Sequence, residues 1–141
     1  MPNHSEITAF IETFKSTAFA KDVSGFLALY DDDARIFDLW KKWSYRGVAA
    51  WKPAVEEWFK HTGENRDAIS LHDVVIQGAE GFCTVTAFIT FSCVDPKGVV
   101  LRAMHERLTL VLTKSQSGWK ILHQHSSAPV GDDLKIRFDR D

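Results

Sequence analysis

The sequence has few cysteines and prolines, little net charge and no long apolar run. Its 141 residues include two cysteines and four prolines, and the formal net charge is −2. A charge so close to zero provides no basic field for nucleic acid or an anionic membrane. No apolar run approaches the roughly 20 residues of a membrane span, and the polar N-terminus does not resemble a signal peptide. We therefore expect a cytoplasmic protein with neither nucleic acid nor a membrane as partner.

The two cysteines are too far apart along the chain for a disulfide within one strand. Cys83 and Cys93 lie ten positions apart in one strand-like run, which corresponds to about 33 Å of extended chain. They share a parity with Val85 and Ile89, so we expect both to be small core residues. The sequence predicts no redox site.

Apolar residues are plentiful enough for one well-packed domain. The hydrophobic fraction is 45% and the charged fraction 26%, which is typical of a globular protein. A chain of this length buries roughly 70% of its unfolded surface, so it needs no disulfide or metal for stability. We expect a single domain over residues 1–141, with a core at about 5–130 and a charged tail at 131–141. Alternating apolar residues in that tail leave open an additional edge strand.

The first sixty residues predict three helices and one short strand. Apolar residues recur at helical spacing in three segments, and Asn3 and Asp22 are suitable caps before the first two. The expected helical stripes cover 7–18, 23–30 and 48–59, with a strand at 34–38 and a loop at 39–46.

From about residue 67 the period of the apolar pattern changes to two. Short turns separate four predicted strands, Ala68–Gln77, Phe82–Val94, Val99–Lys114 and Trp119–Ser127. Short connections indicate an antiparallel meander, and helices followed by strands indicate the α+β class. Most aromatic residues precede the strands, so we expect a large apolar interior, with Trp40, Trp43 and Trp58 lining a cavity.

Polar side chains gather at the odd positions of the last two predicted strands. Hairpin pairing brings Arg107 near His125, and the face then carries His105, Arg107, Thr109, His123 and His125. Buried polar groups must be paired. The cluster is therefore either an internal network or the floor of a ligand pocket, and the sequence leaves both interpretations open.

Asp38 ends the short strand and is followed by aromatic residues. It is either a turn residue or a general base, because a carboxylate at the rim of an apolar cavity acquires a raised pKa. Tyr30 is either a phenol donor into the same cavity or an amphipathic core residue.

A metal site is the alternative for the histidines. His123 and His125 share one strand face, and His105 offers a third imidazole. No carboxylate shares that face, since Glu106 points the other way. The sequence also lacks a Gly-x-Ser-x-Gly elbow and a phosphate-binding glycine loop. We expect no metal and no cofactor.

The run from Phe26 to Asp38, the helix opening at Gly47 and the following meander resemble the SnoaL-like superfamily. That superfamily shares the cone-shaped, cystatin-like fold of nuclear transport factor 2, ketosteroid isomerase and scytalone dehydratase. The segment 118–129 is similar to the branch containing the association domain of calcium/calmodulin-dependent protein kinase II. The resemblance implies three N-terminal helices on a strongly curved antiparallel sheet, a pocket open at one end, and a homodimer formed through the outer sheet face.

The resemblance also suggests roles for individual residues. Asp38 matches the general base of ketosteroid isomerase, and Tyr30 matches a tyrosine of its hydrogen-bond network. The second acid of that enzyme falls near Thr109, where this sequence has no carboxylate, and the position of its main tyrosine donor is Phe14. Steroid isomerisation itself is therefore not expected. In the association-domain branch, pocket arginines and histidines bind small carboxylates, which suits Arg107 and the histidines.

The sequence thus predicts a small cofactor-independent isomerase, cyclase or lyase acting on an apolar, oxygen-bearing molecule. Asp38 is the predicted base, with Arg107, His123 and His125 stabilising negative charge. The alternative is a non-catalytic pocket for a small carboxylate, or an association module. The predicted ligand-binding residues are Trp40, Trp43, Trp58, His105, Arg107, Thr109, His123 and His125.

Overall fold

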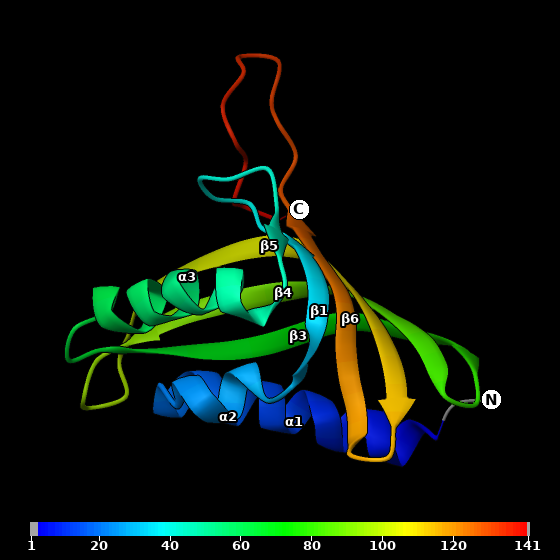
Figure 1. Cartoon of the computed structure of the whole chain (residues 1–141). Helices are drawn as coiled ribbons and strands as arrows, with labels where there is room; N and C mark the ends of the chain where they lie inside the picture. The colour runs from blue at the N-terminus through cyan, green and yellow to red at the C-terminus, as the bar shows by residue number, and fades with distance from the viewer. Residues whose placement is uncertain (1–2, 141) are drawn as a thin grey trace.

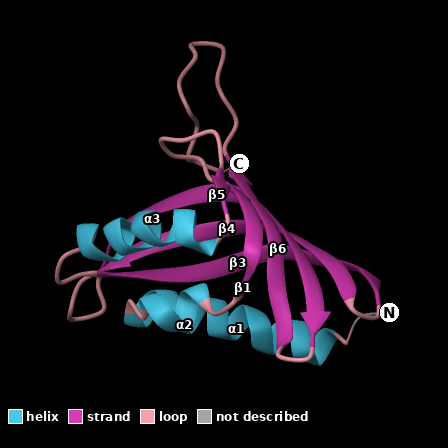
Figure 2. Cartoon of the chain, in the orientation of Figure 1, coloured by secondary structure: helices cyan, strands magenta, loops and turns pink. Residues whose placement is uncertain are grey.

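A computed structural model describes residues 3–140 as three helices and a six-stranded sheet (Figure 1). The elements are α1 (His4–Ala20), α2 (Val23–Leu27), β1 (Tyr30–Phe37), β2 (Tyr45–Arg46), α3 (Val48–His61), β3 (Arg66–Ala79), β4 (Phe82–Val94), β5 (Val100–Ser115) and β6 (Gly118–Ser127). Figure 2 shows the helices packed against a strongly curved sheet, with no helix between the last four strands. The α+β, cystatin-like fold expected from the sequence is confirmed.

The helices begin where the sequence supplies caps. The Asn3 side chain accepts hydrogen bonds from the backbone N–H groups of Ser5 and Glu6, at 3.0 and 3.2 Å. Asp22 caps α2 by accepting from the backbone N–H of Gly25 at 3.0 Å. These side chains satisfy N–H groups that have no partner within the helix.

The sheet has the order β2-β1-β6-β5-β4-β3. All neighbouring strands are antiparallel except β1 and β6, which run parallel and pair Phe37 with His125. The expectation of a wholly antiparallel sheet is therefore corrected at this one pair. This pair of strands brings the end of β1, where Asp38 follows, beside the end of β6.

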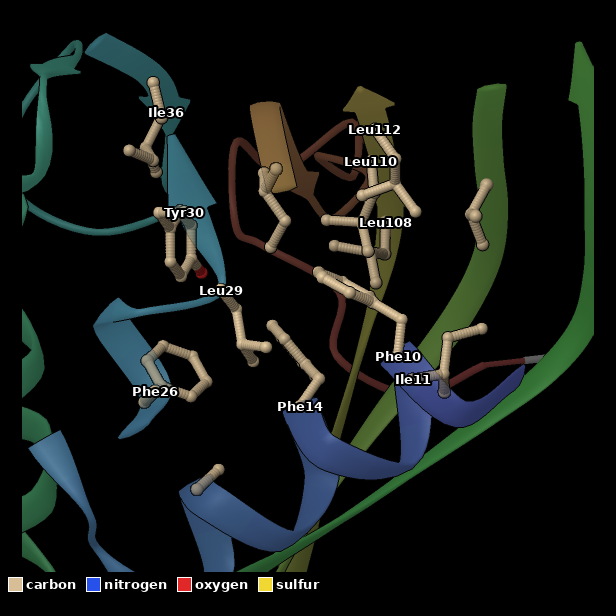
Figure 3. Packing of buried hydrophobic residues seen from close by; sticks show 14 of the residues in the cluster. Phe10, Ile11, Phe14, Phe26, Leu29, Tyr30, Ile36, Leu108, Leu110 and Leu112 are labelled. Atoms are coloured by element: carbon tan, nitrogen blue, oxygen red, sulfur yellow. The ribbon is translucent and has the colours of Figure 1, made fainter. Parts of the chain in front are cut away.

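The core fills the concave side of the sheet. Figure 3 shows Leu108, Leu110 and Leu112 of β5 facing Phe10 and Phe14 of α1. Phe26 is 1% exposed, and its ring centroid lies 5.1 Å from that of Phe14. Cys83 and Cys93 are buried and unpaired by any disulfide, as expected for small core residues.

The charged C-terminal segment folds into a projecting arm, residues Pro129–Arg137 (Figure 1). Its two legs are joined by the hydrogen bond from the Arg137 N–H to the Pro129 carbonyl, at 2.8 Å. After the arm, the Phe138 carbonyl accepts from the His105 N–H at 3.2 Å, and the Phe138 ring stacks on Trp40 with centroids 5.6 Å apart. Within residues 3–140, no helix has the length and apolar content needed to cross a membrane.

Candidate functional site

A cavity of about 520 Å³ lies between the helices and the sheet. Its walls are mainly apolar and include the rings of Phe14, Phe26, Trp51, Trp58 and Phe91. A concave, apolar space with a few polar groups is the usual form of a small-molecule site. We therefore take this cavity as the candidate functional site.

Four carboxyl residues line this cavity, Asp38, Glu57, Asp67 and Glu106. Glu57 pairs with Lys41 and Asp67 accepts from Trp58, and we call the remaining two, Asp38 and Glu106, the acid pair. Asp38 directly follows β1 and Glu106 lies on β5, so the curvature of the sheet brings them to one space. Ser126 of β6 also lines the cavity and donates from Oγ to Asp38 Oδ1 at 3.3 Å. Ser126 also lowers the pKa of Glu106, so it acts on both carboxyl groups.

Burial perturbs both members of the acid pair. Burial raises the pKa of Glu106 to about 7, with a further increase from the charge of Asp38 and a decrease from Ser126. Burial also raises the pKa of Asp38, opposed by the backbone N–H of Trp40, by Ser126 and by the backbone N–H of Leu39. Near neutral pH, Glu106 is therefore protonated in a large fraction of molecules and is able to donate a hydrogen bond.

Tyr30, predicted as a phenol donor into the cavity or as a core residue, lies behind the cavity wall. It is 3% exposed, and its hydroxyl donates to Oε1 of Gln124 at 2.5 Å. Burial raises the pKa of Tyr30, so its phenol stays neutral. Gln124 lines the cavity and Tyr30 does not. The phenol thus orients the Gln124 amide, leaving the amide nitrogen as the natural donor to a ligand.

The histidine and arginine cluster lies on the outer face of the sheet, and none of its members lines the cavity. His105 contacts Thr90 Oγ1 through Nδ1 at 2.8 Å, and Arg107 donates from Nε to Ser127 Oγ at 3.0 Å. The residues placed on this face are His105, Arg107, Thr109, His123 and His125. Of the two interpretations that the sequence left open, they do not form the floor of this cavity, and any contact with a ligand stays a prediction.

The cluster faces outward because, in β5 and in the second half of β6, the even-numbered side chains point to the core and the odd-numbered ones point away from it. The even positions of β5 are the buried ones, as Leu108, Leu110 and Leu112 show. In β6 the register with β5 shifts between Ile121 and His123. Such an irregularity reverses which side chains face inward. Ile121 is buried, but farther along β6 the even positions point inward.

Of the three predicted tryptophans, Trp40 and Trp58 line the cavity and Trp43 does not. Trp58 donates from Nε1 to Asp67 Oδ2 at 2.7 Å, which ties α3 to β3. Trp43 is 97% exposed and lies at a separate outer groove of about 600 Å³. Its predicted place in the cavity is therefore wrong.

Sequence reasoning missed Glu106, Gln124, Ser126 and Arg102, which all line the cavity. The signal for Glu106 was present, because it continues the inward-facing line of Leu112, Leu110 and Leu108. In residues 3–140, no three His, Cys, Asp or Glu side chains come together as a metal site.

Solved structures with the same fold share little sequence with this chain. An NTF2-like protein of unknown function from Pseudomonas putida KT2440 has a TM-score of 0.84 at 22% identity, covering 97% of this chain and 94% of its own. A candidate calcium/calmodulin-dependent protein kinase II association domain from Xanthomonas campestris has a TM-score of 0.77 at 16% identity, covering 90% and 88%. A protein of unknown function with a cystatin-like fold from Nostoc punctiforme reaches 0.71 at 16% identity, covering 93% and 95%.

These likenesses show the fold, and the family follows from the sequence match. No curated protein matches the sequence significantly. The model of the SnoaL-like domain matches residues 7–131, the part of the chain that builds the helices, the sheet and the acid pair. The chain belongs to the SnoaL-like domain family.

Proposed function

We propose that the cavity catalyses proton transfer on a small, mostly apolar molecule that carries a carbonyl oxygen. The observation that carries this proposal is the acid pair, half-buried Asp38 and buried Glu106, which face one apolar cavity beside Ser126. The reaction class is an isomerisation, cyclisation or elimination that needs a base and a hydrogen-bond donor. No cofactor enters the proposal.

Asp38 is the proposed general base. Its carboxylate removes a proton from the carbon beside the substrate carbonyl, the C–H electron pair forms the C=C bond of the enolate, and the C=O π pair moves to the oxygen. Protonated Glu106 donates a hydrogen bond to that oxygen and stabilises the enolate. Return of the proton to another atom gives an isomer, attack on a second carbonyl closes a ring, and loss of a leaving group completes an elimination.

The apolar walls support this chemistry. Aromatic rings such as Trp51, Trp58 and Phe91 give the cavity of the acid pair a mainly apolar lining. In such a low-dielectric space a hydrogen bond to developing charge is stronger than in water. Glu106 therefore takes the charge-stabilising role that the sequence assigned to Arg107, His123 and His125, and the acid sought near Thr109 lies three residues earlier.

Deuterium exchange tests the proposal. 2-Tetralone, an apolar ketone with acidic C–H groups, is incubated with the protein in D2O, and ¹H NMR follows the loss of its signal. We expect Asp38→Asn to lower the enzymatic rate by about 100-fold or more and Glu106→Gln to lower it by about 10-fold or more. Glu80→Gln in the exposed β3–β4 turn is the matched control. Exchange by Asp38→Asn at the wild-type rate would contradict the proposal.

Arg102 favours a second candidate function, the binding of a small carboxylate without catalysis. It lines the cavity four residues from Glu106 along β5, and no ion pair involving it is present in residues 3–140. A guanidinium of this kind suits a carboxylate ligand. Titration calorimetry with 2-naphthoate separates the candidates, since a binding module loses affinity in Arg102→Gln and is indifferent to Asp38→Asn.

We further propose that the protein acts as a homodimer. The likeness to a candidate association domain, at 16% identity, supports this assembly. Sedimentation equilibrium of the full chain measures it directly, and a single species of 16.0 kDa at all concentrations would contradict it.

A further inference from the structure

The two most exposed large apolar side chains in residues 3–140 lie on two separate segments, the loop between β1 and β2 and the C-terminal arm. Trp43 is 97% exposed on the loop beside the outer groove, and Leu134 is 85% exposed at the tip of the arm. Neither the indole ring of Trp43 nor the methyl groups of Leu134 are buried against other residues of the chain. A single exposed apolar side chain is common on protein surfaces, so the case for an interaction surface depends on the structure and charge around these two residues.

The arm is a built structure and not a frayed end. Within its tip, the Gly131 N–H donates to the Lys135 carbonyl and the Leu134 N–H to the Gly131 carbonyl, both at 2.8 Å. Leu134 adopts a φ of 65°, a left-handed conformation that is costly for this residue type. The chain therefore spends conformational energy to present Leu134 outward. Phe138 anchors the base of the arm through its contacts with His105 and Trp40.

The outer groove has a charge opposite to that of the arm tip. Its lining carries the cations Arg35 and Lys42 against the single carboxylate Asp38, together with the rings of Phe37 and Trp43. The arm tip carries Asp132 and Asp133 against the single cation Lys135, all three exposed, so it is acidic overall. Lys41 also lines the groove but pairs with Glu57 at 2.5 Å. The groove thus offers a cationic and aromatic surface, and the tip offers two carboxylates and a leucine.

The arm cannot fill the groove of its own chain. The groove borders His125 and Ser126, directly before the base of the arm, whereas the tip projects away from the body (Figure 1). Six residues of extended chain from Pro129 to Leu134 reach about 20 Å. A second copy related by a two-fold axis satisfies both surfaces at once, because each arm tip then meets the other copy's groove.

We propose that two copies of this chain exchange their arms. Leu134 of the partner subunit packs on Trp43, and Asp132 of the partner subunit pairs with Lys42 and Arg35 in the outer groove. Asp38 and Ser126 line both this groove and the cavity. The exchanged arm therefore covers the outer side of the wall that holds Asp38. This inference rests on the proposed homodimer and names its interface.

Sedimentation equilibrium on the full chain tests the exchange. We expect the wild type to be a dimer, and we expect Leu134→Asp and Trp43→Ala each to raise the dimer dissociation constant at least tenfold. Asp132→Lys and Lys42→Asp should each weaken the dimer in the same way, and the double charge-reversal variant should recover at least half of the loss. Circular dichroism verifies that every variant keeps the wild-type fold.

Thr86→Lys is the matched control, because Thr86 is exposed on the outer sheet face and lies two strands from the groove residue His125. It should leave the exchanged dimer intact. A dimer that Thr86→Lys breaks and the arm variants leave unchanged would overturn the exchange and keep the homodimer. A monomeric wild type would overturn both. Deuterium exchange by the acid pair is measured separately and tests the catalytic proposal alone.

Discussion

Glu106 makes the stability of the fold depend on pH. Its pKa rises from an ordinary value of 4.5 to about 7 because the side chain is buried. Below pH 4.5 the Glu106 carboxyl is protonated in both the folded and unfolded chains, and its raised pKa does not lower the free energy of unfolding. As pH rises towards 7, the unfolded chain ionises first, so folding stability falls; above 7 the full cost, about 3 kcal/mol, is present.

Glu106→Gln should therefore stabilise the protein at alkaline pH relative to the wild type. The gain in unfolding free energy at pH 8 should exceed that at pH 4.5 by up to about 3 kcal/mol. Urea unfolding at the two pH values measures this difference. Glu80→Gln, in an exposed turn, should show no such pH-dependent gain. An equal effect of Glu106→Gln at both pH values would show that the carboxyl is not held in its neutral form.

Residue identities alone predicted one half of the acid pair. Asp38 was identifiable because it ends a strand and precedes aromatic residues, and the structure places it at the cavity. Its base role stays a prediction. Glu106 was assigned to the solvent side because the neighbouring imidazoles suggested a polar pocket. The apolar alternation of Leu108, Leu110 and Leu112 is the stronger physical signal, since burial of apolar area decides which face of a strand packs inward.

At the scale of elements, α3 and β3 are joined at the cavity by one indole. Trp58 donates to Asp67 at 2.7 Å, and both residues line the cavity. The ring also lies edge-on to Phe26, with centroids 5.6 Å apart. The hydrogen bond thus fixes an aromatic wall of the cavity to the sheet.

Trp58→Phe should destabilise the fold by about 1–3 kcal/mol, because Asp67 loses its donor and stays partly buried. Chemical denaturation measures the loss. Adding Asp67→Leu removes the unpaired carboxylate and should recover part of the stability. No recovery in the double variant would mean that the lost ring volume, and not the hydrogen bond, causes the effect.

In β6, the sequence predicted the wrong inward-facing side chains, because the sequence does not show where the register between strands shifts. Ile121, His123 and His125 alternate regularly along the sequence, so the pattern predicts that all three side chains lie on one face of the sheet. The register shift after Ile121 turns the later residues over, bringing Gln124 and Ser126 to the cavity. A shift of this kind depends on the pairing of β6 with β5 and β1, which are distant partners in the chain.

At the scale of the whole molecule, the order of helices and strands was predictable from the sequence. The change of apolar period near residue 67 and the short turns predicted β3 to β6 to within two residues at each end. The parallel pairing of β1 with β6 was not predictable, because it joins segments that about 80 residues separate. The arm was also missed, since Pro129–Arg137 is stabilised mainly by its own backbone hydrogen bonds.

The acid pair is the central feature of this account, and carboxyl ¹³C NMR titration tests it most directly. Asp38→Asn and Glu106→Gln assign the two resonances. We predict that Glu106 titrates near pH 7, and that its pKa falls in Asp38→Asn because the neighbouring negative charge is removed. A Glu106 pKa near 4.5, unchanged by Asp38→Asn, would contradict the claim that these two carboxyl groups act together in one buried site.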